Sequence, residues 1–145
     1  PWIAKNAWAF RLESPGHVLN AGFEGEGFWH CEEIYVFRNN GPSLDKSRVL
    51  LSLDTSKDRN FELLRDEYKP KVSRDRQYTV AWIHEYGKGR VFVSNLGHNL
   101  STYAQPHILK HYLAGIQYAL GDIEADTTPS SKLEKTEIAP APEWK

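Results

Sequence analysis

A chain of 145 residues, 40% of them hydrophobic and 12% aromatic, is long enough and apolar enough to form the core of one domain. Its 18 basic and 19 acidic residues leave a formal net charge of -1, which gives no electrostatic basis for binding nucleic acid or an anionic membrane. The single cysteine, Cys31, excludes an internal disulfide framework and a thiolate zinc cluster built by this chain alone.

Three strands are predicted in the first half of the chain. Residues 7–12, AWAFRL, have strand character, and a Ser-Pro-Gly turn at 14–16 ends them. A loop follows, and within FWHCEEIYVF residues 34–37 have strand character, which places Glu32 and Glu33 at the entrance of a strand. Residues 48–53, RVLLSL, form a continuous apolar run that is typical of a buried strand.

The next segment is strongly charged. Asp, Glu, Lys and Arg make up 11 of the 19 residues from 58 to 76, and Pro70 interrupts the stretch. Because runs of charge usually face water, we expect an exposed excursion between strands, with a binding surface as the alternative.

A β-hairpin is predicted over residues 81–95. Residues 81–86 and 90–95 are rich in β-branched and aromatic side chains, and Gly87 and Gly89 suit a tight reversal. The second strand stops at LGHN, residues 96–99. Ligands of open α/β sheets bind beyond the carboxyl ends of strands, so His98 is the leading functional candidate among the histidines.

Residues 106–120 predict the clearest helix of the chain. Pro106 suits its first turn and Gly121 its C-terminal stop. Apolar residues recur at helical spacing, and we expect the face that they form to pack on the sheet: Ile108, Leu109, Tyr112, Leu113, Ile116 and Leu120.

The composition changes after Asp126. Residues 126–145 are rich in Pro, Ser, Thr and Lys, and we interpret them as a tail or linker after a domain of residues 1–125, because such a segment buries little apolar surface. The chain starts at Pro1 and contains no methionine, which suggests a piece of a longer polypeptide. Any targeting signal would lie upstream, so both the cytoplasm and the periplasm of a bacterium stay open as compartments.

His98 and Glu33 are the catalytic candidates. Imidazoles titrate near neutral pH and suit general acid–base chemistry. Neighbouring residues on a strand point to opposite faces, so we expect Glu33 to face the site and Glu32 to be solvated or to support it from behind. The alternative for His98 is a loop histidine that only bonds the backbone.

Metal binding stays open as a weaker alternative. His30 and Cys31 precede the two glutamates, although neighbours on one strand chelate poorly. His107 and His111 have the i,i+4 spacing of a helical metal site, but we expect both to face solvent. A divalent metal is therefore a cofactor that the sequence neither requires nor excludes.

Three further residues carry weak signals. Cys31 is a nucleophile candidate with His98 as its base, although an incidental cysteine is commoner. Arg90 follows a Gly-Lys-Gly turn that could receive an anion. His17 is expected in a turn with no local partner.

The hairpin and helix sequences, AWIHEYGKGRVFVSNLGHN and YAQPHILKHYLAGIQYALGD, resemble the C-terminal half of the ThuA-like, or trehalose-utilisation, domain. The initial Pro-Trp is similar to the end of that family's Gly-His-Pro-Trp segment, and CEEIYVF is similar to its Asp-Glu-Ile-Tyr segment. Two positions depart from the family pattern: Glu32 stands in place of Asp, and Val18 follows His17 in place of Pro.

The resemblance implies a flavodoxin-like, class I glutamine amidotransferase-like α/β fold of three layers, with the N-terminal parallel strands and helices absent from this chain. His98 is similar in position to the histidine that follows a late strand in those amidotransferases, whose cysteine nucleophile belongs to the absent half. The family's association implies a carbohydrate substrate: trehalose, a related disaccharide or a 3-keto sugar.

We therefore expect a sugar-directed hydrolase, lyase or isomerase, in which His98 is the acid/base and Glu33 orients it or shares a metal. The substrate-binding candidates are Tyr35, Asn99, Trp29 and Arg90, with the aromatic rings stacking on a sugar face. The alternative is a non-catalytic carbohydrate-binding or interaction domain of a larger protein. The expected partners are a small carbohydrate, the absent N-terminal half and, through exposed sheet edges, a second copy of the chain.

Overall fold

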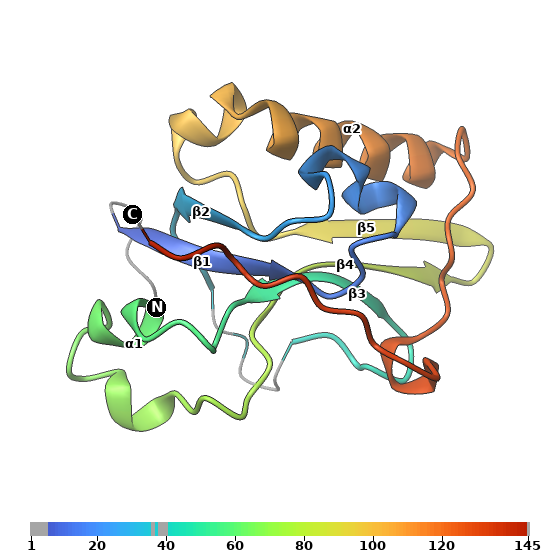
Figure 1. Cartoon of the computed structure of the whole chain (residues 1–145). Coiled ribbons are helices and arrows are strands. Elements are labelled where there is room, and N and C mark those ends of the chain that lie inside the picture. Colours follow the sequence, from blue (N-terminus) through green and yellow to red (C-terminus); the bar gives the residue numbers. More distant parts are fainter. Residues whose placement is uncertain (1–5, 36, 38–40, 145) are drawn as a thin grey trace.

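The computed structural model describes residues 6–35, 37 and 41–144. They form a mixed α/β domain around one sheet of five strands in the order β2-β1-β3-β4-β5 (Figure 1). Every neighbouring pair of these strands is antiparallel. In chain order the strands are β1 Ala7–Leu12, β2 Phe28–Cys31, β3 Arg48–Leu53, β4 Thr79–Tyr86 and β5 Gly89–Ser94.

Helical elements lie on both sides of this sheet (Figure 1). The long helix α2, Pro106–Leu120, and the 3-10 helix η1, Val18–Phe23, pack against each other over one face. The short helix α1, Arg59–Glu62, and the 3-10 helix η2, Lys69–Lys71, lie across the other. The 3-10 helix η3, Leu100–Ala104, precedes α2. A further 3-10 helix, η4, Ser130–Lys132, belongs to the C-terminal segment.

The strands with the clearest local patterns form where the sequence predicts them. The predictions at 7–12 and 48–53 are confirmed by β1 and β3, and every residue of β3 is buried. The predicted hairpin is β4 and β5, paired from Ala81↔Ser94 to Tyr86↔Gly89. Gly87 has φ +62°, the left-handed conformation that a two-residue reversal needs.

The strand predicted at 34–37 is the exception. The sheet instead uses Phe28–Cys31 as β2, which pairs with β1 from Ala7↔Cys31 to Phe10↔Phe28. Phe28 stacks on Phe10 with a centroid separation of 5.0 Å, so packing with β1 selects the earlier segment. The chain leaves the strand at Glu32, and Val36 lies outside the described residues.

The predicted helix 106–120 is confirmed by α2, whose C-cap Gly121 is left-handed with φ +88°. The predicted packing face is mostly wrong. Ile108 and His111 are fully buried, whereas four large apolar residues of the predicted face are 42–73% exposed: Leu109, Leu113, Ile116 and Leu120. Gly115 explains the choice of face, because a Cβ there would clash with the ring of Phe92 on β5.

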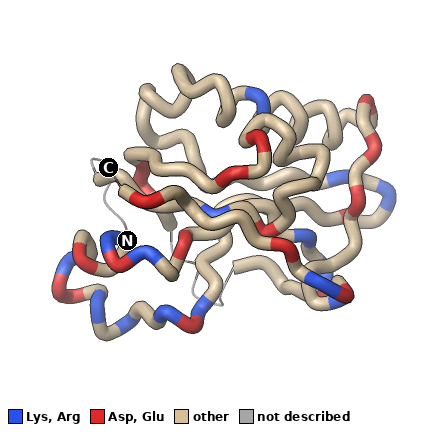
Figure 2. The backbone as a smooth tube through the Cα atoms, in the orientation of Figure 1, with Lys and Arg blue, Asp and Glu red and all other residues tan. Residues whose placement is uncertain are grey.

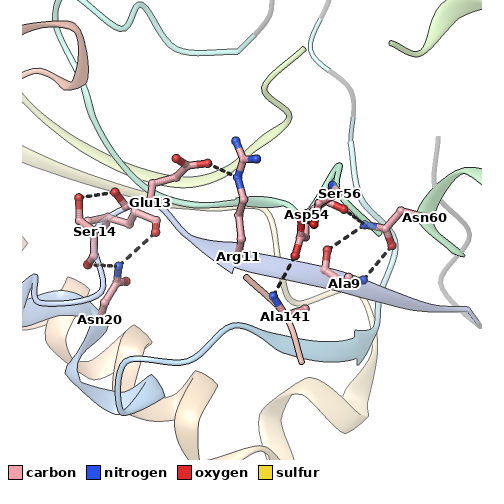
Figure 3. Close-up of polar contacts among 10 residues, drawn as sticks. Ala9, Arg11, Glu13, Ser14, Asn20, Asp54, Ser56, Asn60 and Ala141 are labelled. Carbon is pink, nitrogen blue, oxygen red and sulfur yellow. Dashed lines mark hydrogen bonds and ion pairs between the residues drawn. The ribbon is translucent and has the colours of Figure 1, made fainter. Parts of the chain in front are cut away.

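Charged residues concentrate in the excursion between β3 and β4 and are sparse along α2 (Figure 2). The predicted exposure of residues 58–76 holds for most of their side chains, but Asn60 is buried. Its side-chain amide accepts from the N–H of Ala9 at 2.8 Å and donates to the carbonyl oxygens of Ala9 and Asp54 at 3.0 and 2.9 Å (Figure 3). This one amide attaches α1 to the middle of β1.

The C-terminal segment, expected to bury little surface, lies against the sheet as an ordered strap. Leu12 and Ala139 exchange two backbone hydrogen bonds, of 2.9 and 3.0 Å. The N–H of Ala141, a residue only 2% exposed, donates to the carboxylate of Asp54 at 2.9 Å (Figure 3). Backbone pairing therefore supplies the order that the composition of this segment does not predict.

The flavodoxin-like architecture, whose parallel strands are expected outside this chain, stays a prediction. Within the described part of the chain the α/β class holds, and the sheet is antiparallel throughout. The described residues contain no helix with the length and apolarity needed to cross a membrane.

Candidate functional site

The candidate site lies in the loop between β5 and η3, at the carboxyl end of β5. Gly97 has φ +121°, a conformation that other residues rarely adopt. A Cβ at this position would lie 2.8 Å from the hydroxyl oxygen of Tyr103, which itself donates to the Gly97 carbonyl at 3.2 Å. Gly97 therefore lets the loop turn closely against η3 and leaves the neighbouring His98 exposed.

The backbone of this loop is held by Glu32. Its carboxylate accepts from the N–H groups of Gly97 at 2.8 Å and Asn99 at 3.1 Å, and so binds the residues on both sides of His98. It also accepts from the N–H of Glu33 at 2.9 Å and from the hydroxyl of Thr102 at 2.6 Å. The sequence left two alternatives for Glu32, a side chain exposed to solvent or one that supports the site from behind. Because the residue is 0% exposed, the structure favours the supporting position.

The electrostatics of this cluster favour a charged Glu32 and a neutral His30. Burial on its own would raise the pKa of Glu32, but the hydrogen bonds from Thr102, Gly97, Glu33 and Asn99 together lower it below its usual value. Burial lowers the pKa of His30, whose Nε2 lies 2.7 Å from the Thr102 hydroxyl oxygen.

His98 and Glu33, both predicted as catalytic, are brought together by the fold. Nδ1 of His98 lies 3.1 Å from a carboxylate oxygen of Glu33, and their side chains are 51% and 30% exposed. A carboxylate can only accept, so this contact places a proton on Nδ1. Nε2 is then the nitrogen available to exchange a proton with a bound molecule.

A shallow cavity of about 350 Å³ opens beside His98. Its wall is formed by the end of β5 and by Tyr35 and Phe37. Tyr35, a predicted substrate-binding residue, is 55% exposed, and its backbone is held by the Asn95 side chain through hydrogen bonds of 3.3 and 3.1 Å. An exposed aromatic ring therefore stands near an imidazole with a free nitrogen.

The other three predicted substrate-binding residues do not line this cavity. Asn99 is next to His98, but its side-chain amide donates to the Cys31 carbonyl at 2.8 Å. The indole N–H of Trp29 donates to the carbonyl of Pro142 in the C-terminal segment. Arg90 lies at the opposite end of β5 from His98 and pairs with Glu124 at 2.6 Å.

Two histidine predictions are corrected by their burial. His111 is fully buried and its Nδ1 lies 2.7 Å from the Leu19 carbonyl oxygen, so it does not face solvent. His17 does have local partners: its Nδ1 accepts from the N–H of Leu19 at 3.2 Å, and its Nε2 lies 3.0 Å from the Asp126 carbonyl oxygen. Burial lowers the pKa of His17. Both imidazoles bond the backbone around η1.

No group of three or more His, Cys, Asp or Glu side chains in the described residues has the arrangement of a metal site. His30 is directed to Thr102, and Cys31 is exposed. The structure thus does not assemble the metal site considered around His30 and Cys31 from the part of the chain that it describes.

Two larger cavities, of about 570 and 590 Å³, lie away from His98 along residues 124–129. The charged and imidazole side chains that line the first are His17, Arg48, Lys135, Glu124, Asp126 and Glu137, and no Phe, Trp or Tyr is among its lining residues. We place the candidate site in the cavity beside His98, because Tyr35 and Phe37 line it and His98 contacts the carboxylate of Glu33 there.

The sequence did not identify three residues of the site: Asn95, Thr102 and Tyr103. Thr102 is 70 positions from Glu32 in the chain, and no local pattern encodes a contact of that kind. Asn95 carried a weak signal, because an asparagine at the end of a predicted strand often hydrogen-bonds a neighbouring backbone.

A family model described as ThuA, trehalose utilisation, matches residues 4–119. This range includes all five strands, the Glu32 cluster, His98 and nearly all of α2. Searches of curated proteins and of solved structures gave no match. The family match confirms the resemblance and supports a role in carbohydrate utilisation, and because it covers most of the sequence, the chain belongs to the ThuA family.

Proposed function

We propose that this protein acts on trehalose, a related disaccharide or its 3-keto form, with His98 as acid/base. The observation that carries the proposal is the 3.1 Å contact between His98 and Glu33 beside a cavity with an exposed aromatic wall. The family match supports the carbohydrate class independently of this geometry.

The pair has a definite chemical capacity. Glu33 holds the proton on Nδ1 of His98 and stabilises the imidazolium that forms when Nε2 takes up a proton. Nε2 could remove a proton from a sugar hydroxyl, or from the carbon beside a keto group, and return it to a leaving oxygen or to a neighbouring carbon. Hydrolase, lyase and isomerase reactions all need such a step.

Tyr35 would bind the sugar. The apolar face of a pyranose ring packs well on an aromatic ring, and the hydroxyl groups at its rim bond polar side chains. The Asn95 amide fixes the backbone of Tyr35, so the aromatic wall keeps its place relative to β5. A cavity of about 350 Å³ is near the lower end of the usual range for small-molecule sites, which suits one sugar ring.

The proposal includes the flavodoxin-like, class I glutamine amidotransferase-like architecture. The described antiparallel strands would then form one part of a larger sheet that is completed by N-terminal parallel strands. Two observations support this: β5 is an edge strand, and α2 beside it exposes large apolar side chains. A structure of a longer form with a strand paired to β5 would test it.

The function is tested by calorimetry and by product analysis with trehalose and 3-keto-trehalose. Glu33→Gln and Tyr35→Ala are compared with Glu85→Gln and Tyr86→Ala, which make the same changes at the exposed hairpin end. We expect about a 100-fold loss of turnover for His98→Ala, of the order typical for an acid/base residue, with the hairpin variants unchanged. Turnover that survives His98→Ala would contradict the proposal.

A non-catalytic carbohydrate-binding domain is the second candidate. The openness of the site favours it, because half of the His98 side-chain surface is exposed and water is poorly excluded. In that case Tyr35→Ala would weaken sugar binding, no product would form, and His98→Ala would have only a small effect.

A further inference from the structure

Glu32 occupies an unusual position for a carboxylate. It is fully buried between the end of β2, the His98 loop and η3, and the described structure gives it no cationic partner within ion-pair distance. Four neutral donors satisfy it instead, three of them backbone N–H groups. Such an arrangement compensates the cost of burying the charge and ties together segments far apart in the sequence.

The arrangement requires a carboxylate and not an amide. One oxygen accepts from the N–H groups of Glu33 and Asn99, and the other accepts from the N–H of Gly97 and the hydroxyl of Thr102. Both oxygens therefore face donors. The NH₂ group of a glutamine at this position would face two donors whichever way the amide turned.

The Thr102 hydroxyl extends the cluster to a second buried side chain. Because its single proton is donated to Glu32, the same oxygen accepts from Nε2 of His30 at 2.7 Å. A neutral His30 supplies that proton, in agreement with the effect of its burial. The direction of every hydrogen bond in the chain from His30 to Glu32 is thus defined.

We propose that Glu32 is the positioning residue for His98, a role that rests on the proposed function for its catalytic meaning. Glu32 bonds the amides immediately before and after His98, so it fixes the backbone from which the imidazole projects towards Glu33. The two adjacent glutamates thus have different partners: Glu32 binds the backbone of the His98 loop, and Glu33 contacts the imidazole ring of His98.

The test is nuclear magnetic resonance on the 145-residue chain without any sugar. Glu32→Gln is compared with Glu33→Gln, its matched control one residue away. Two signals are followed: hydrogen exchange at the amides of Gly97 and Asn99, and the ring ¹⁵N shifts of His98, which report the bond from Nδ1. We expect Glu32→Gln to raise exchange at both amides at least about tenfold and to change the ring shifts. Glu33→Gln should change the ring shifts alone.

Unchanged exchange and unchanged ring shifts in a folded Glu32→Gln protein would overturn the proposal. If that variant fails to fold, Thr102→Val removes one of the four donors and leaves the carboxylate in place. It should raise exchange at Gly97, which shares an oxygen of Glu32 with Thr102, more than at Asn99. Equal or absent effects at the two amides would also overturn it. Neither signal depends on a substrate, so failure of the sugar proposal is distinguishable from failure of this one.

Discussion

Glu32 and Glu33 are neighbours in the chain, yet one carboxylate is fully buried on the backbone of the His98 loop and the other reaches the exposed imidazole of His98. The chain turns after β2, and this turn places the two carboxylates in different surroundings. These surroundings determine what each of the two identical side chains can do.

Gly97→Ala should destabilise the protein and displace His98. The new methyl group would be strained at φ +121° and would lie 2.8 Å from the Tyr103 hydroxyl oxygen. We expect a loss of about 1–3 kcal/mol in the free energy of unfolding, measured by urea denaturation. Gly25→Ala is the control, because that glycine has φ +84° with open space around it. An equal loss at both sites would mean that the contact with Tyr103 contributes nothing.

The stability of the protein should fall as the pH drops from 6.5 towards 4. Burial lowers the pKa of His111 to about 4. Between pH 6.5 and 4 this imidazole is therefore protonated in the unfolded chain but neutral in the folded protein. The stabilisation is complete above pH 6.5, and about 3 kcal/mol is lost by pH 4. His111→Asn, which keeps a donor for the Leu19 carbonyl, should flatten this dependence in urea titrations.

Gly27→Ala should release the C-terminal strap. A Cβ at Gly27 would lie 2.5 Å from the carbonyl oxygen of Phe10 and 2.6 Å from the backbone of residues 140 and 141, so the strap must move. Limited proteolysis should then cut residues 133–144 several times faster than in the parent protein. Gly16→Ala has open space and serves as the control. Unchanged cleavage would show that the close approach at Gly27 does not hold the strap.

We expect the exposed apolar side chains of α2 to mediate association with a second copy, so Leu113→Lys should reduce association and dye binding without loss of stability. Leu113 is 56% exposed in the apolar stripe of α2, so the charge enters water and not the core. We expect a change within about 0.5 kcal/mol in the free energy of unfolding, together with lower light scattering and weaker binding of a hydrophobic dye. Tyr86→Lys, at an isolated residue that is 81% exposed, should alter neither signal. Scattering that stays high would place the association elsewhere.

Local patterns in the sequence predicted much of the fold. The hairpin, β3 and α2 are encoded by turn glycines, a continuous apolar run and helix caps, which lie within a few residues of the elements that they define. The choice of β2 over residues 34–37 depended on stacking between Phe28 and Phe10, and the face of α2 on the fit of Gly115 to Phe92. Such contacts join distant segments and leave no periodic signal.

The candidate site was predictable to a similar degree. His98 followed from its place after a strand, and the expectation that Glu33 orients it agrees with their 3.1 Å contact, although the catalytic roles of both stay predictions. The burial of Glu32 depends on three donors from residues 97–102 in addition to the N–H of Glu33, and no local sequence pattern predicts these three distant partners.

The pairing of Leu12 with Ala139 sets the order in which the domain can be completed during synthesis. β1 is synthesised long before the strap, so the backbone groups of Leu12 that face the strap stay unpaired until residue 139 has been added. Likewise, the carboxylate of Asp54 lacks the hydrogen bond from the N–H of Ala141 until residue 141 has been added. A nascent chain therefore carries a partly unpaired strand until residue 139 has been synthesised, and a truncation before that residue would leave the strand open for pairing with other chains.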